Sequence, residues 1–143
     1  MKVRSLWLAS LLLGAALSLP ATVSSAQLVE KSYGDRLLRL AEILGAIHHL
    51  RDICGANEGQ LWREKMLEML EAEAPPGQFR ARLIAAFNNG FRGYRRTYSS
   101  CTASAKTAEN RFLTEGSELA TGLTDTLAAS LAEAEDEGGS SAQ

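Results

Sequence analysis

The residues in this 143-residue sequence that are best suited to binding chemistry are arginines and tyrosines gathered between Phe79 and Cys101. Five arginines lie in this stretch, and no acidic residue occurs between Glu73 and Glu109. Guanidinium groups form paired hydrogen bonds to carboxylate or phosphate, and tyrosines add stacking and a hydroxyl donor. We therefore predict a partner-binding surface for an acidic protein surface or an anionic envelope component, formed by Arg92, Arg95, Arg96, Tyr94, Tyr98, Asn88 and Asn89.

Two features of this stretch have structural alternatives. The arginines could instead form weak exposed ion pairs with a neighbouring acidic helix that carries Glu64, Glu68, Glu71 and Glu73. Asn88 and Asn89 are poor helix formers, so they either hydrogen-bond across the core or line a polar binding notch. Gly90 lies on the apolar stripe, where its missing side chain would allow another helix to approach closely.

His48, His49 and Asp52 form a second candidate site. Adjacent helical residues point about 100° apart, so the two histidines cannot easily chelate one metal together. Zinc or copper would need further ligands from another helix. The alternative function is therefore a small-ligand or metal-binding helical bundle that uses these three residues, and the simpler interpretation is one hydrogen-bonded and one solvated histidine.

No pattern in the sequence indicates catalysis. GxSxG, HExxH and a phosphate-binding glycine loop are all missing from the sequence. Met66 and Met69 are spaced as core residues of an amphipathic helix, which we favour over haem ligation. We predict a protein that is not an enzyme and needs no cofactor.

The N-terminus has the features of a secretory signal peptide. Lys2 and Arg4 precede the apolar run Leu6–Leu19, and small residues lead to Ala26. We predict cleavage after Ala26 and a periplasmic location. Removing Lys2 and Arg4 from the 15 basic residues leaves 13 against 17 acidic ones, which argues against nucleic-acid binding. No later stretch has the length and apolar character of a transmembrane segment.

Export determines how the two cysteines are interpreted. Thiols in an oxidising compartment tend to pair, and Cys54 and Cys101 permit one intramolecular pairing. The sequence lacks CxxC and CxxCH, which excludes thioredoxin-like chemistry and c-type haem attachment. We expect one structural disulfide.

Apolar residues recur at helical spacing in four segments, and no strand pattern competes with them. The expected helices are Tyr33–Cys54, Glu58–Ala74, Phe79–Cys101 and Ala103–Ala134. Capping patterns place Ser32 with Asp35 before the first helix and Asn57 with Gln60 before the second, and Ser100 or Thr102 before the fourth. The alternative for the last two segments is one continuous rod, because no proline or glycine separates them.

These segments predict an all-α fold, a small up-down four-helix bundle with one disulfide. Alternating helices place the ends of the first and third helices, and hence both cysteines, at the same pole. The domain organisation we expect is a signal peptide over 1–26, the bundle over 27–134 and a disordered acidic tail over 135–143.

Several of these segments resemble one family. They are LGAIHHLRDIC, Trp62 with Met66 and Leu70, AFNNGFRGYRRTYSSCT, and NRFLTEG, which together span most of Leu37–Gly116. The chain is similar to a family of small exported alphaproteobacterial proteins that share a domain of unknown function. The resemblance implies a periplasmic location in a Gram-negative cell and implies no particular activity.

Overall fold

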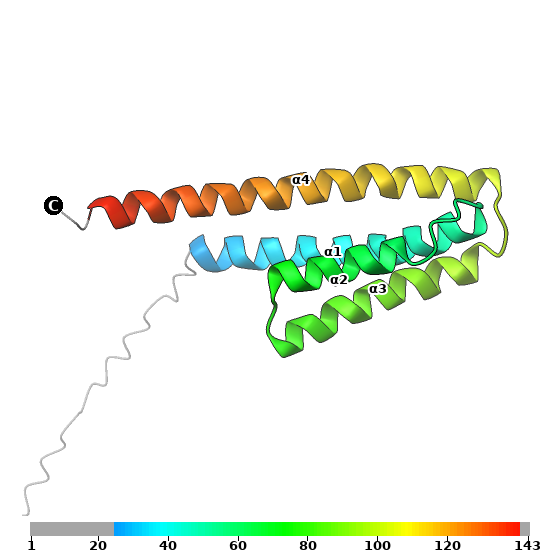
Figure 1. The fold of residues 1–143 in the computed structure, drawn as a ribbon, viewed down its shortest axis with the longest axis horizontal. Coiled ribbons are helices and arrows are strands. Elements are labelled where there is room, and N and C mark those ends of the chain that lie inside the picture. The colour runs from blue at the N-terminus through cyan, green and yellow to red at the C-terminus, as the bar shows by residue number, and fades with distance from the viewer. Residues whose placement is uncertain (1–24, 141–143) are drawn as a thin grey trace, which may run out of the picture.

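The computed structural model describes residues 25–140, and the side chains of residues 27–136. These residues form four helices and no strand: α1 Ser25–Ile53, α2 Leu61–Glu73, α3 Gly77–Thr97 and α4 Ala103–Ser140 (Figure 1). The predicted all-α class is confirmed. Residues 1–24, nearly all of the predicted signal peptide, lie outside the described residues. Within residues 25–140, no helix is both long enough and apolar enough to cross a bilayer.

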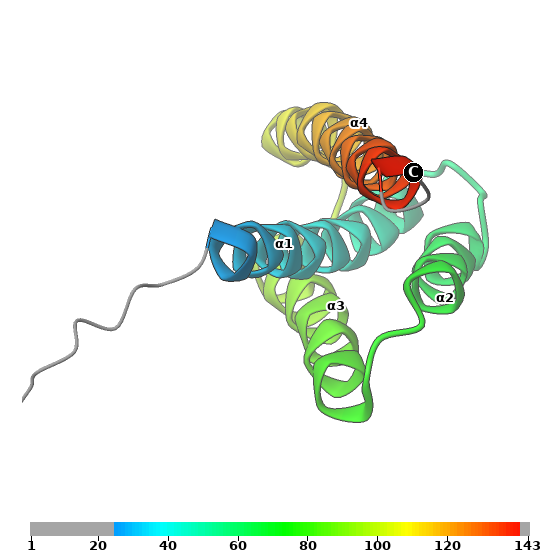
Figure 2. The same cartoon turned by 90° about the vertical axis from the view of Figure 1, so that its left-hand side faces the viewer.

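α1 is the central helix of the fold. α2, α3 and α4 each pack against it, and their backbones approach one another less closely than they approach α1. Figure 2 shows α3 and α4 on different sides of α1, with α2 beside it. Successive helices run in opposite directions (Figure 1). The closed up-down bundle stays a prediction, because the observed packing converges on one helix.

The sequence of α1 explains its central position. Every residue from 43 to 50 is buried, as expected for a helix that is covered on all sides. Two apolar clusters meet along it. The first joins α1 to α2 and α3 through Leu44, Met66 and Phe87, and the second joins α1 to α4 through Ile47 and Phe112.

α1 and α3 approach most closely at two glycines. A Cβ atom added at Gly45 would lie 1.9 Å from the carbonyl oxygen of Phe87, and one at Gly90 would lie 2.0 Å from that of Glu42. Both contacts are with backbone, which cannot rotate away. The expectation that Gly90 permits close helix approach is confirmed, and Gly45 is the matching glycine on α1.

The disulfide between Cys54 and Cys101 is confirmed, with the two Cα atoms 4.8 Å apart. It joins the end of α1 to the loop between α3 and α4. That loop shows that the continuous-rod alternative is wrong, because Tyr98 has extended backbone and ends α3. The Oγ1 atom of Thr102 accepts a hydrogen bond from the Ala105 amide at 3.1 Å, so Thr102 caps α4 as one of the two predicted residues.

The two other predicted capping boxes are wrong. α1 begins at Ser25, so Ser32 and Asp35 lie inside the helix, where nothing interrupts the backbone. Asn57 has a φ of 51°, and its side-chain amide donates back to the Gly55 carbonyl at 3.2 Å. The chain therefore continues as a turn, and α2 begins at Leu61 without a side-chain cap.

α4 is longer than its leucine spacing indicated. It continues to Ser140, beyond the predicted end at Ala134 and into the segment predicted as a disordered tail. This extension consists of Glu135, Asp136, Glu137, Gly138, Gly139 and Ser140, so its helix continues through residues that are mostly poor helix formers. Residues 141–143 lie outside the described residues.

Arginines of α1 hold α4 in place. Arg39 donates two hydrogen bonds to Glu115, at 2.6 Å and 3.0 Å, and this pairing lowers the pKa of Glu115. Arg36 donates to the Gly122 carbonyl at 3.2 Å and to the Thr126 hydroxyl at 2.8 Å. These bonds fix the register between the two helices.

Candidate functional site

The arginine surface consists of Arg92, Arg95 and Arg96 on the last turns of α3. All three side chains are exposed. Within residues 27–136 none of them forms an ion pair, and Arg92 donates only to Asn89 on its own helix, at 3.3 Å. Three cationic groups are therefore available to an external partner.

The alternative in which the α3 arginines pair with α2 is not observed among the described side chains. Arg80 donates to the Leu70 carbonyl near the end of α2, at 3.3 Å, and Arg82 lies over the Phe79 ring. The α2 carboxylates have other partners or face solvent: Lys65 binds Glu68, and the Tyr33 hydroxyl binds Glu73.

The two tyrosines of the predicted surface serve mainly to anchor it. Tyr94 and Tyr98 are half-buried and stack with ring centroids 6.1 Å apart. Tyr94 also meets Phe112 of α4 edge-on at 4.9 Å. These contacts tie the end of α3 to the core and leave the arginines outside. Asn88 is half-buried and Asn89 is exposed, and neither makes a cross-helix hydrogen bond within the described residues.

The three residues of the histidine site lie in different environments. His48 is buried between the rings of Phe87 and Phe91, with centroid distances of 6.1 Å and 5.5 Å. The Nε2 atom of His49 donates to the Tyr98 carbonyl at 2.7 Å, which assigns the proton to that nitrogen. Asp52 is exposed. Among the described residues no group of three or more potential ligands is arranged to hold a metal ion.

The burial of His48 leads to a pH-dependent prediction. Burial lowers the pKa of His48 from its ordinary value of 6.5, and the charge of Arg63 lowers it further. Below pH 6.5 the unfolded chain therefore binds a proton that the folded chain does not. We expect the free energy of unfolding to decrease as the pH falls below 6.5, and His48→Gln to remove this decrease, as measured by urea denaturation between neutral pH and about pH 5.

The matched control is His49→Gln, the neighbouring position, in which the decrease should persist. A wild-type stability that stays constant through this pH range would contradict the assignment of a neutral buried imidazole.

Arg51 organises the pole of the molecule that carries the disulfide. It forms an ion pair with Glu58 of the α1–α2 loop and another with the buried Glu109 of α4, at 2.8 Å. Glu58 also accepts a hydrogen bond from the Trp62 indole at 2.6 Å, and its pKa is lowered by Arg51. Sequence reasoning missed this network because Arg51 and Glu58 meet across a turn and Glu109 lies 58 positions away from Arg51. Its effect is to pair the carboxylates of both Glu58 and Glu109 with the Arg51 guanidinium.

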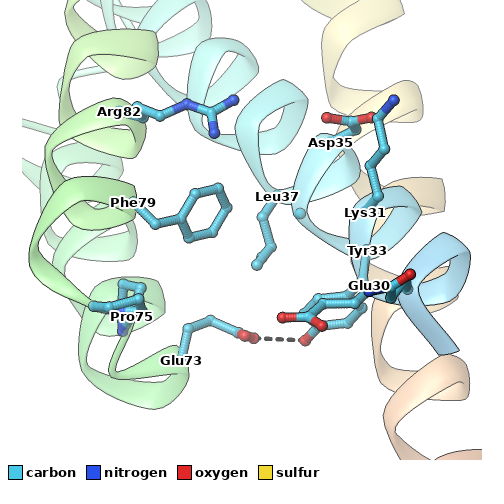
Figure 3. Close-up of a pocket in the computed structure, with 12 residues that line it drawn as sticks. Glu30, Lys31, Tyr33, Asp35, Leu37, Glu73, Pro75, Phe79 and Arg82 are labelled. Atoms are coloured by element: carbon cyan, nitrogen blue, oxygen red, sulfur yellow. Dashed lines mark hydrogen bonds between the residues drawn. The ribbon is translucent and has the colours of Figure 1, made fainter. Parts of the chain in front are cut away.

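A pocket of about 530 Å³ opens where the start of α1 faces the α2–α3 connection (Figure 3). Figure 3 shows Phe79 directed toward Leu37, and the Tyr33 hydroxyl donating to Glu73 at 2.8 Å. Burial and the bond to Glu73 raise the pKa of Tyr33 to about 12. A phenol with a raised pKa stays protonated at neutral pH, so Tyr33 acts in this pocket as a hydrogen-bond donor. Sequence analysis gave no signal for it.

These features define the class of protein. It is an all-α, disulfide-linked protein with an exposed arginine surface fixed to its core. The chain belongs to the family described as "Protein of unknown function (DUF2385)", whose family model matches residues 32–127. Neither a curated protein nor a solved structure matches the chain.

Proposed function

We propose that the protein is exported to the periplasm and acts there, without catalysis, as an interaction protein of the cell envelope. Its contact surface is the arginine surface of α3, which binds the carboxylates of an acidic partner. The observation that carries this proposal is that Arg92, Arg95 and Arg96 are exposed and lack ion-pair partners among the described side chains.

The rigidity of the surface supports the proposal. The Tyr94 ring contacts Phe112, the Tyr98 carbonyl accepts from His49, and the Cys54–Cys101 disulfide closes the loop that follows. A surface that is fixed before binding loses less conformational entropy when a partner binds. The disulfide supports export, because such bonds persist in oxidising compartments.

The test is capture of envelope proteins by immobilised protein. Reversing the three charges with Arg92→Glu, Arg95→Glu and Arg96→Glu should abolish recovery of the partners that wild-type protein retains. The matched control carries the same change in net charge at other exposed positions: Lys31→Glu, Arg63→Glu and Lys65→Glu. This control should recover the partners at the wild-type level. Equal recovery by the arginine variant would rule out this surface.

A further inference from the structure

The last turns of α3 and the far part of α4 carry opposite charges. Arg92, Arg95 and Arg96 lie at the end of α3, in a stretch with no acidic residue between Glu73 and Glu109, whereas seven acidic residues and no basic one follow Arg111. α4 begins beside the end of α3 and runs to the opposite end of the molecule (Figure 1). With 38 residues it is about 57 Å long, so the acidic residues at its far end lie well beyond reach of the arginine surface.

The far part of α4 also exposes an apolar stripe. The last α4 leucine to be buried is Leu123, which is 6 % exposed. Leu127 and Leu131 continue the same stripe at one-turn intervals, yet they are 50 % and 59 % exposed. We call residues 125–136 the acidic arm: its exposed side chains include Asp125, Glu133, Glu135 and Asp136 along with these two leucines. Such a helix face has the composition of an unpaired interface.

A pocket lies just after the arginine surface in the chain. It has a volume of about 280 Å³, lies between the α3–α4 loop and α4, and is lined by Tyr98, Ser104, Thr107, Ala108 and Arg111. Arg111 lies over the Phe112 ring and forms no ion pair within residues 27–136. This pocket offers apolar surface next to a cation, Arg111, that has no ion-pair partner among the described side chains. The acidic arm offers the complementary groups, which are two leucines next to carboxylates.

We propose that the acidic partner of the arginine surface is the acidic arm of a second copy of this chain. Two copies side by side in antiparallel orientation place each arm against the arginine surface of the other, so both contacts form in one closed, twofold pair. Parallel copies would instead place like charges together. This inference rests on the proposed function in one respect: it takes the arginine surface as a contact surface, and it names a second copy of the chain as the occupant.

The experiment is sedimentation of the full mature chain as a function of concentration, with two charge-reversed variants. One variant carries Arg92→Glu, Arg95→Glu and Arg96→Glu, and the other carries Glu133→Lys, Glu135→Lys and Asp136→Lys. Wild-type protein should dimerise at about 0.01 M ionic strength and dissociate at about 1 M. The reason is that the electrostatic screening length is about 30 Å at the lower ionic strength and about 3 Å at the higher one. Each variant alone should lose dimerisation, because its two ends then carry like charges.

The decisive sample is the equimolar mixture of the two variants. Mixing restores opposite charges at both contacts, so the mixture should form dimers that neither variant forms alone. The control for the arm is Glu64→Lys, Glu68→Lys and Glu71→Lys on the outer face of α2, which should dimerise as wild-type protein does.

Three results would overturn the inference: a wild-type protein that stays monomeric at low salt, dimers that survive the reversal of either end, or a mixture that stays monomeric. If any of these occurs while the arginine variant still loses its envelope partners, the proposed function stands and the self-association fails. If the arginine variant no longer dimerises but still captures the envelope proteins that wild-type protein captures, the inference stands. The proposed contact between the arginine surface and an envelope partner is then wrong.

Discussion

Replacing Gly90 with alanine is expected to destabilise the protein by about 3 kcal/mol or more, or to prevent folding. The new Cβ atom would lie 2.0 Å from the carbonyl oxygen of Glu42, a distance that van der Waals contact forbids. Since the obstacle is backbone, α1 and α3 must separate and the apolar contacts between them must loosen. Gly45→Ala should have a similar effect, because its Cβ atom would lie 1.9 Å from the Phe87 carbonyl oxygen. Urea denaturation measures the change.

The matched control lies three residues further along the same helix. A Cβ atom at Gly93 would meet no atom within 4 Å outside its own helix backbone. Gly93→Ala should therefore leave stability unchanged or raise it by up to about 1 kcal/mol through helix propensity. If Gly90→Ala proves as stable as Gly93→Ala, the close approach of α1 and α3 is not the true packing.

Loss of the disulfide is the second large effect we expect. The cysteines are 47 residues apart, and closing a loop of this length stabilises a fold by about 4 kcal/mol in the chain-entropy model. The double variant Cys54→Ser, Cys101→Ser should lower the free energy of unfolding by about that amount, as measured by urea denaturation without reductant.

Reduced wild-type protein provides the control for this variant. Its unfolding curve should match that of the double variant, because both lack the same cross-link. Identical midpoints for oxidised and reduced wild-type protein would show that the disulfide does not stabilise the fold.

The sequence predicted features that depend on local pattern. Helical spacing predicted four helices, and two cysteines with one possible pairing predicted the disulfide. Gly90 could be identified because glycine inside an apolar stripe is costly unless something packs against it. The same argument applies to Gly45, so the sequence could also have predicted the close approach at this second glycine.

Other features depend on tertiary contacts that no local pattern carries. Arg51 meets Glu109 across 58 positions, and Tyr33 meets Glu73 across 40. Whether the arginines of α3 face α2 or solvent depends on the angle between helices, which spacing does not determine. The capping errors have a related cause: Ser32 and Asn57 have suitable side chains, but the backbone there is a continuous helix in one case and a turn in the other.

Export and oxidation together form the central claim, because they place the arginine surface in a compartment where the disulfide holds it rigid. The most direct test is the intact mass of the protein isolated from its own cells in the presence of an alkylating agent and without reductant. We predict a chain that begins at Gln27 and carries no alkyl group, with Cys54 bonded to Cys101. A chain that retains Met1–Ala26 and is alkylated at both cysteines would contradict the account.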